Sequence, residues 1–213
     1  MRHIFQEINS TNERLRVYNP NLWDSILAIE QHSGRGRRDN SWHSPKGGFY
    51  FSISAPKHRL LPLLAGLSAK LSLESFHQIN ISLKWPNDLL LDGKKLGGIL
   101  CESNDDFAIV GVGINVETTP DISSSISLKD LGLTVNIYDL ANEFENILKH
   151  ELINFDSNDF FIRYRKAEVL LGKTVKWNNS KGLVVDINDC GELVVEAGQN
   201  TFSLNAEEVH LEH

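Results

Sequence analysis

The stretch KWPNDLLLDGKKLGGIL, residues 84–100, contains the clearest folding signal of this chain. Residues 88–91 and 96–102 have the composition of β-strands, and Asp92-Gly93 between them is a strong signal for a tight hairpin turn. Trp85 stands before Pro86, which favours a rigid, extended backbone at that corner. We therefore predict two antiparallel strands that are joined at residues 92–93.

Further strands and helices are predicted on both sides of this hairpin. Short apolar runs bounded by turn residues predict strands at 25–31, 48–55, 81–84 and 107–115. Ser10 and Glu13 have the spacing of a capping box and predict a helix start. Apolar residues at helical spacing predict three more helices: one from Leu60 with Pro62 in its first turn, one through Leu140, Phe144, Ile147 and Leu148, and one through Phe161 and Tyr164.

The texture of the sequence changes near residue 170. Strand-like pieces alternate there with turns, at 174–177, 182–186, 191–196 and 199–202. This pattern predicts a small all-β barrel. Some 40 residues make a marginal core, so we expect the barrel to pack on the main domain.

Composition excludes several classes of protein. The 213 residues include 21 Lys+Arg and 28 Asp+Glu, for a formal charge of −7, and no apolar run is long enough to span a membrane. The first residues lack the apolar core of a secretory signal, so Cys101 and Cys190 are interpreted as reduced thiols of a cytoplasmic protein. The histidines and cysteines show no spacing typical of a structural metal site.

The run Gly34-Arg35-Gly36-Arg37-Arg38 is a dense basic cluster on this acidic background. Its glycines let backbone N–H groups approach a ligand closely, which favours a local anion or phosphate site. The ordinary alternative is a solvated charged loop. Gln31 before the run and Trp42 after it add a polar donor and an aromatic wall.

Two other motifs allow a structural and a functional interpretation. Asn87-Asp88 could hold ribose hydroxyls, an amine or Mg²⁺, or it could be a turn that satisfies its own backbone. Lys95, before Gly97-Gly98, could be held at a pocket wall or be a solvated hairpin lysine. Gly172-Lys173-Thr174 lacks the first glycine and the strand–loop–helix context of a phosphate loop, and we treat it as a chance match.

Read in order, these motifs resemble those of the biotin protein ligases. The resemblance covers nearly the whole chain and rests on five segments: Ser10-Thr11-Asn12, the Arg/Gly run with Trp42, Lys84-Trp85-Pro86-Asn87-Asp88, Lys95-Leu96-Gly97-Gly98-Ile99-Leu100 and Gly113-Ile114-Asn115. It implies an α/β (α+β) fold, with a mixed-sheet catalytic domain at 1–169 and an SH3-like β-barrel at 170–213.

The resemblance also implies a two-step reaction. Biotin and Mg-ATP would give biotinoyl-5'-adenylate and pyrophosphate, and the acyl group would pass to a lysine of a biotin carboxyl carrier domain. Cations aimed at the attacked phosphate suit this chemistry, because negative charge develops there. Neither a serine nor a cysteine nucleophile is needed.

Site roles follow from the resemblance by position. Catalysis is assigned to Lys95 and Arg37. Biotin binding is assigned to Ser10, Thr11, Asn12, Gln31, Arg35, Gly36, Arg37 and Lys95. Nucleotide binding is assigned to Arg38, Trp42, Asn87, Asp88 and Asn115, with Asp88 as the candidate ligand for Mg²⁺.

The chain departs from the family pattern at three places. Asp39 stands where the family usually has glycine, and 182–186 lacks the arginine that some relatives place near ATP. The nine residues before Ser10 leave no room for a helix-turn-helix, so we expect no DNA binding, and no membrane partner; a homodimer is a weaker expectation.

Three other functions compete with this interpretation. A lipoate ligase or octanoyl transferase shares the fold class but typically has a different Arg-Arg-Gly-Gly-Gly segment. A nucleic-acid-binding protein is opposed by the acidic composition. A non-catalytic biotin or nucleotide sensor would bind the same ligands without releasing pyrophosphate.

Overall fold

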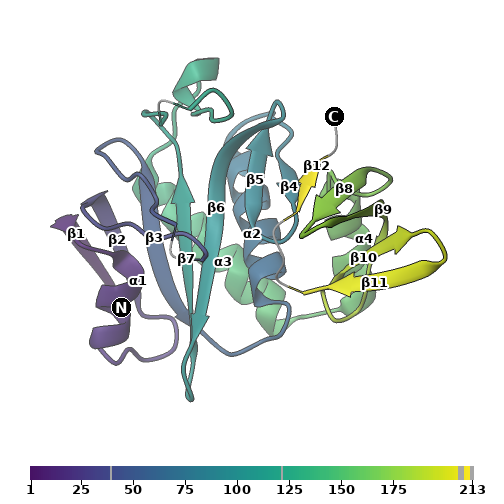
Figure 1. The fold of residues 1–213 in the computed structure, drawn as a ribbon. Coiled ribbons are helices and arrows are strands. Elements are labelled where there is room, and N and C mark those ends of the chain that lie inside the picture. Colours follow the sequence, from purple (N-terminus) through teal and green to yellow (C-terminus); the bar gives the residue numbers. More distant parts are fainter. Residues whose placement is uncertain (39, 121, 206–208, 212–213) are drawn as a thin grey trace.

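The computed structural model describes residues 1–38, 40–120, 122–205 and 209–211 (Figure 1). Within these residues the larger sheet has seven strands in the order β1-β2-β3-β7-β6-β5-β4. Strands β1 and β2 are parallel and all other neighbours are antiparallel, so the sheet is mixed, as the resemblance implies. The strands are β1 (Arg2–Ile8), β2 (Ser25–Gln31), β3 (Phe49–Ala55), β4 (Ser82–Lys84), β5 (Asp88–Leu91), β6 (Lys94–Ser103) and β7 (Ala108–Ile114).

The hairpin predicted at residues 92–93 is confirmed. It joins β5 to β6, and Asp92 and Gly93 have φ values of 50° and 73°, as a tight hairpin turn requires. The other strands predicted for this sheet are also present, with ends shifted by up to two residues. Strand β1 was not predicted from the sequence.

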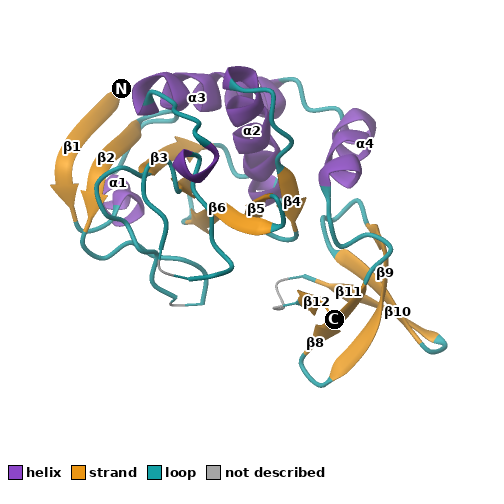
Figure 2. Ribbon diagram, turned by 90° about the horizontal axis from the view of Figure 1, so that it is seen from above, coloured by secondary structure: helices purple, strands orange, loops and turns teal. Residues whose placement is uncertain are grey.

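Helices cover both faces of the larger sheet (Figure 2). Helices α2 (Leu61–Phe76) and α3 (Ile137–Ile153) pack on one face and α1 (Thr11–Val17) on the other. Alternation along β2 explains how both faces are buried, since Leu27 belongs to the main core under α2 and α3 while Ile26 packs with Leu15 of α1. The remaining helical elements are α4 (Ser157–Ala167) and the short η1 (Lys129–Leu131).

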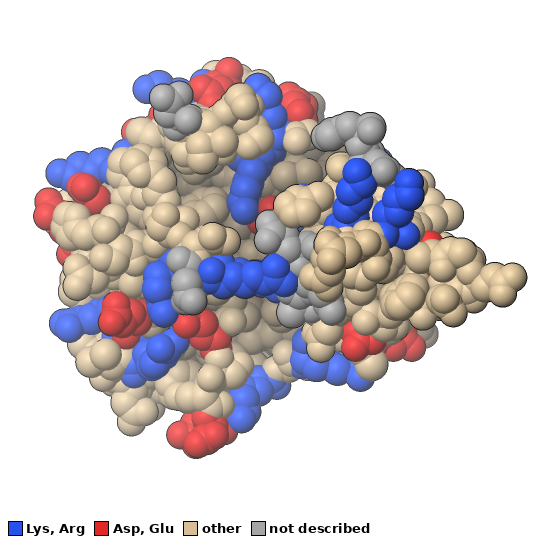
Figure 3. Space-filling model, viewed as in Figure 1, with Lys and Arg blue, Asp and Glu red and all other residues tan. Residues whose placement is uncertain are grey.

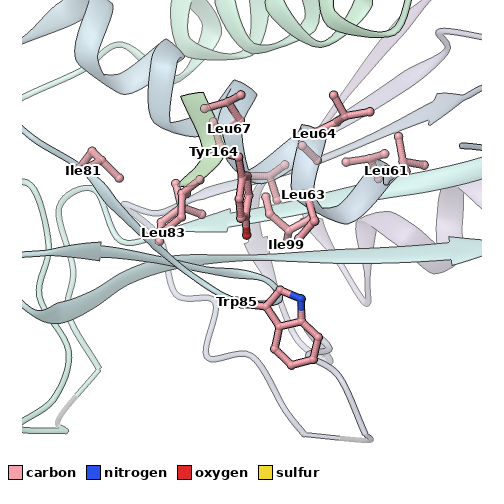
Figure 4. Close-up of a cluster of buried hydrophobic side chains, with 14 of the residues drawn as sticks. Leu61, Leu63, Leu64, Leu67, Ile81, Leu83, Trp85, Ile99 and Tyr164 are labelled. Carbon is pink, nitrogen blue, oxygen red and sulfur yellow. The ribbon is translucent and has the colours of Figure 1, made fainter. Parts of the chain in front are cut away.

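The main core lies between the larger sheet and helices α2, α3 and α4. Figure 4 shows leucines of α2 gathered with Tyr164 of α4 and with Leu83 and Ile99 of the sheet. Each fully buried leucine contributes roughly 1.5–3 kcal/mol, so this cluster is a main source of stability for the sheet. Pro62 lies in the first turn of α2, where a missing N–H costs nothing.

The predicted barrel is a five-stranded antiparallel sheet in the order β11-β10-β9-β8-β12. It is not closed, because β11 and β12 are its two edges and do not pair with each other in the described part of the chain. Its strands are β8 (Thr174–Trp177), β9 (Ser180–Ile187), β10 (Leu193–Ala197), β11 (Asn200–Leu204) and β12 (His210–Leu211).

The second sheet is attached to the larger one at the β4–β5 connection. The indole of Trp85 is buried and donates from Nε1 to the carbonyl of Gly191 at 2.9 Å. Val169 N donates to Leu83 O at 2.9 Å, and Arg165 of α4 is paired with Asp186 of β9 at 2.7 Å. These contacts place the second sheet beside the Lys84–Asp88 segment. Among all described residues, no helix has the length and apolar character needed to cross a membrane.

Candidate functional site

A pocket of about 220 Å³ opens on the α1 face of the larger sheet. It is bounded by the start of α1, the Arg/Gly run, the segment 84–88 and strands β6 and β7. In Figure 3, lysine and arginine side chains lie around the hollow between the two sheets. The described lining residues include five cationic side chains, Arg35, Arg37, Arg38, Lys84 and Lys95, and a single carboxylate, that of Asp88. The pocket is therefore suited to an anionic ligand.

Glycines of β7 form the floor of the pocket. A Cβ at Gly111 would lie 2.2 Å from Asn12 Oδ1, and a Cβ at Gly113 would lie 2.5 Å from Trp42 Nε1. Any larger residue would displace a side chain that lines the site. These two positions need glycine for close approach, as glycine inside a strand often indicates.

One end of the pocket is built from polar side chains that bind one another. Thr11 donates to Gln31 Oε1 through its backbone N at 2.8 Å and lies 3.1 Å from it through Oγ1. Gln31 Nε2 in turn donates to Ser44 Oγ at 2.9 Å. Ser10 caps α1, accepting from Glu13 N at 3.4 Å, so the capping prediction is confirmed at the Ser10 side. Each ligand-facing group here has a fixed orientation before any ligand arrives.

Asn12 and Arg35 meet at Glu102 of β6, which is not in the pocket lining. Asn12 Nδ2 donates to Glu102 Oε2 at 2.8 Å, and Arg35 Nη2 lies 2.9 Å from Glu102 Oε1. Burial opposes ionisation of Glu102, but hydrogen bonds from Asn12 and Arg16 and the charges of both arginines outweigh it and lower its pKa. Glu102 is therefore ionised at neutral pH.

The Arg/Gly run folds back on itself and reaches across the pocket. Gly36 N donates to Asn40 O at 2.6 Å, and Arg37 Nη1 donates to Asn87 Oδ1 at 3.3 Å. Two motifs fifty residues apart in the sequence thus meet at one site. Arg38 has a left-handed backbone, with φ of 53°, and lines the pocket. Asp39, the departure noted in the sequence, lies outside the described residues.

Lys95 lies at the opposite end of the pocket from the polar network. Its Nζ is 2.6 Å from Asp88 Oδ1 and 5.5 Å from the centroid of the Trp42 ring. The Lys95 side chain is 37% exposed and that of Asp88 is 21% exposed. An ammonium held in this way can exchange its carboxylate partner for the oxygens of an anionic ligand.

The pocket brings together every predicted site residue except one. Ser10, Thr11, Asn12, Gln31, Arg35, Gly36, Arg37, Arg38, Trp42, Asn87, Asp88 and Lys95 all line it. Asn115 does not. It is buried beyond the end of β7, where its side chain donates to Ile126 O at 3.1 Å and its carbonyl accepts from Leu128 N. This arrangement holds residues 126–128 against the sheet.

Sequence reasoning missed residues that support the pocket from behind or from the second sheet. Val209 and His210 line it from the C-terminal segment, which no local motif indicated. Ser44 and Ser52 complete the polar network, and Glu102 joins it to Arg35. A carboxylate at position 102 could have been noticed, because it falls on the same face of β6 as Gly98, two alternations along the strand.

The family of the chain follows from comparison with known proteins. A family model described as the Biotin/lipoate A/B protein ligase family matches residues 4–117. The chain belongs to this family. The matched region contains the Arg/Gly run, the 84–88 segment and Lys95, so it includes all of the pocket except the C-terminal contribution.

Individual relatives agree with this membership. The solved structure of a biotin protein ligase from Aquifex aeolicus in complex with biotin and ATP has a TM-score of 0.89 and 29% identity, covering 99% of this chain and 98% of that one. A biotin–[acetyl-CoA-carboxylase] ligase of Mycobacterium tuberculosis is 28% identical over 209 residues, which are 87% of this chain and 79% of the relative.

A third relative is longer than this chain. The bifunctional ligase/repressor BirA of Bacillus spizizenii is 32% identical over 149 residues, which are 62% of this chain. The match spans 46% of that relative, so this chain corresponds to less than half of its length.

Proposed function

We propose that this protein is an ATP-dependent biotin ligase that activates biotin as biotinoyl-5'-adenylate and transfers it to a lysine of a biotin carboxyl carrier domain. The observation that supports this best is that the Arg/Gly run contacts Asn87 and lines one cationic pocket together with Lys95. Membership of the biotin/lipoate ligase family and the likeness to a ligase solved with biotin and ATP support the same reaction.

In the first step a biotin carboxylate oxygen attacks the α-phosphorus of ATP. An O–P bond forms, the bond to the bridging oxygen of the β-phosphate breaks, and pyrophosphate leaves. We assign to Lys95 the neutralisation of both the carboxylate and the attacked phosphate; the pairing of its ammonium with the carboxylate of Asp88 at 2.6 Å supports this role. Arg37 supplies a second cation from the Arg/Gly run. Preorganised charges of this kind account for much of the rate in such reactions.

In the second step the carrier lysine attacks the acyl carbon of the adenylate. A C–N bond forms, the C–O bond to the phosphate breaks, and AMP leaves while the amine loses a proton. Asp88 is the carboxylate in the described lining that could orient the incoming amine. The same carboxylate is the candidate ligand for Mg²⁺. The described residues contain no cluster of three or more metal-ligating His, Cys, Asp or Glu side chains, so in this proposal Mg²⁺ would arrive bound to ATP.

The site residues divide between two ligands in this proposal. Biotin binds at the polar end, on Ser10, Thr11, Asn12, Gln31, Arg35 and Gly36, with Arg37 and Lys95 at its carboxylate. The nucleotide binds at the Lys95 end, on Arg38, Trp42, Asn87 and Asp88. Asn115 has a buried structural position, so its proposed contribution to nucleotide binding is through the segment it holds.

Several finer features belong to the same proposal. The catalytic domain comprises residues 1–169, and residues 170–213 form an SH3-like module, supported by five short antiparallel strands. The partner is a carrier domain. Homodimerisation, absence of DNA binding and a cytoplasmic location stay predictions. The formal charge of −7 favours the absence of DNA binding.

The alternative within the family is a lipoate ligase or an octanoyl transferase. The two are separated by calorimetric titration of biotin, lipoate and octanoate, followed by pyrophosphate release with ATP and each acid. Biotin-dependent pyrophosphate release supports the proposal. Release with lipoate alone would establish the alternative, and biotin binding without release would establish a sensor.

A further inference from the structure

We propose that Glu102 is a positioning residue that sets the hydrogen-bond polarity of the polar end of the pocket and holds Arg35 in place. The inference rests on the proposed function for its kinetic consequence, but its geometry is independent of the ligand. Glu102 lies on β6, outside the pocket lining, and connects three separate elements: Asn12 and Arg16 of α1, Arg35 of the Arg/Gly run, and β6 itself.

The first consequence concerns Asn12. An ionised carboxylate can only accept hydrogen bonds, so it fixes which end of the Asn12 amide faces it. Nδ2 donates to Glu102 Oε2 at 2.8 Å and to Leu100 O at 3.3 Å, which commits both amide protons to the protein. Oδ1 is therefore left facing Ser52 Oγ, at 2.6 Å.

The orientation of the Asn12 amide also affects the hydroxyl of Thr11, through Ser52. Ser52 Oγ lies within hydrogen-bonding distance of both Asn12 Oδ1, at 2.6 Å, and Thr11 Oγ1, at 2.7 Å. A serine hydroxyl has one proton, and an amide oxygen can only accept, whereas a threonine hydroxyl can also donate. Glu102, together with the carbonyl of Leu100, therefore determines how the donors and acceptors of this buried chain are arranged.

The second consequence concerns Arg35. Its Nη2 lies 2.9 Å and 3.0 Å from the two oxygens of Glu102, and Arg16 Nη2 lies 2.7 Å from Oε1. Two guanidinium groups face one carboxylate that is only 22% exposed. Without its charge, Arg16 and Arg35 would repel each other and the first arginine of the run would lose its anchor.

Glu102→Gln removes the charge and keeps the volume of the side chain. A glutamine can present an NH₂ group to Asn12, Arg16 or Arg35, all of which are donors in the native network. We expect KM for biotin to rise about tenfold, the loss of roughly one charge-assisted hydrogen bond, while kcat and KM for ATP change less than about twofold.

Glu145→Gln is the matched control. Glu145 of α3 is also a partly buried glutamate, 16% exposed, that pairs with two cations, Arg2 and Lys149, and these pairings overcome burial to lower its pKa. It does not line the pocket. If the effect came only from losing a glutamate that pairs with two cations, both variants would show it equally. We expect only Glu102→Gln to change KM for biotin.

Limited trypsin digestion tests the anchoring of Arg35 without any ligand. We expect the Arg35–Gly36 bond of Glu102→Gln to be cleaved about fivefold faster than in the wild type, as its flanking segment opens more often, with Glu145→Gln within about twofold of the wild type. Equal cleavage rates in all three proteins would overturn the inference, as would an unchanged KM for biotin in an active variant. If the wild-type protein neither binds biotin nor turns it over, the proposed function is refuted. The trypsin digestion needs no ligand and would still decide the role of Glu102.

Discussion

The two ends of the pocket are built on opposite principles. At the polar end, Thr11 is hydrogen-bonded to Gln31. Asn12 is hydrogen-bonded to Leu100 and Ser52. At the other end, Lys95 pairs with Asp88 through partly exposed side chains. The first end is rigid before a ligand arrives, and the second can be rearranged by one.

The energies of the two ends differ accordingly. An ion pair as exposed as that of Lys95 with Asp88 contributes about 0–1 kcal/mol, so a ligand can replace Asp88 at little cost. Breaking one bond of the buried network would leave an unsatisfied polar group, at about 1–3 kcal/mol. In the proposed function, biotin would therefore be recognised at the end that costs more free energy to rearrange, and the reaction would take place at the end that costs less.

The largest effect is expected at the Lys95 end. Lys95→Ala should slow biotin-dependent pyrophosphate release about a hundredfold, because removing a preorganised charge from a transition state costs on the order of 3 kcal/mol. Biotin binding at the polar end should change much less. Lys94→Ala, which removes the exposed neighbouring lysine, is the control. Near-normal pyrophosphate release by Lys95→Ala would contradict the assignment.

The next effect is expected at the polar end. Gly111→Ala would place a Cβ 2.2 Å from Asn12 Oδ1, and Asn12 is too tightly bonded to yield. We expect biotin affinity by calorimetry to fall roughly thirtyfold, about 2 kcal/mol. Gly66→Ala in α2 is the control, since its Cβ would meet Leu83 at an ordinary 3.8 Å. Unchanged biotin affinity in Gly111→Ala would show that this end is not rigid.

Trp42→Ala tests whether the two ends bind different ligands. The indole packs over Gly113 and beside Lys95, at the end of the pocket to which we assign the nucleotide. Loss of a stacking surface costs about 1–3 kcal/mol per base, so ATP affinity should fall about tenfold or more and biotin affinity little. Parallel titrations with both ligands measure this. An equal loss for both would assign Trp42 to the core of the site instead.

Arg37→Gly tests the connection across the pocket. It removes the donor to Asn87 Oδ1 and should loosen retention of the adenylate rather than abolish its formation. Released acyl-adenylate would label lysines of a bystander protein, and we expect labelling to rise a few-fold, on the order expected for one lost hydrogen bond. Arg37→Lys keeps the charge and serves as control. Bystander labelling equal to the wild type would mean that Arg37 does not close the site.

The smallest effect on activity is expected from Glu168→Gln, outside both ends. Burial raises the pKa of Glu168 to about 8, although bonds such as that from Leu170 N partly oppose the shift. Between about pH 4.5 and pH 8 the folded protein retains a proton on Glu168 that the unfolded chain loses. The contribution of Glu168 to the free energy of unfolding is therefore fully present below about pH 4.5 and is lost as pH rises towards 8. Glutamine should remove that dependence and stabilise the fold at pH 8 by on the order of 2 kcal/mol. Melting temperatures at pH 5 and pH 8 measure it, and parallel pH profiles for both proteins would contradict it.

The sequence predicted local features well where one residue type decides the conformation. Asp92-Gly93 gave the β5–β6 turn, and Pro62 and the apolar spacing gave α2. Strand β1 was missed because it is a polar edge strand that, among the described residues, pairs only with β2, and it is half-buried or exposed along its length. Its formation depends on β2, whose paired residues lie 23 positions further along the chain (Arg2 with Ser25), and no local pattern contains that pairing.

The site was predicted where its residues stand in short motifs. Lys95 and the Arg/Gly run could be named because family motifs surround them. Glu102 and His210 could not, because their roles depend on which side chains a distant segment places beside them. The barrel predicted after residue 170 is not confirmed, because the second sheet is not closed in the described residues, and the number of strands does not determine whether the two edges pair.

The central claim is most directly tested by the mass of a carrier domain after incubation with the protein, biotin and ATP. The account predicts that the carrier gains the mass of one biotinoyl group on a single lysine, with one pyrophosphate released for each carrier modified, and that a carrier with that lysine changed to arginine gains nothing. A carrier of unchanged mass beside an active control ligase, or one that gains mass only when lipoate or octanoate replaces biotin, would contradict the account.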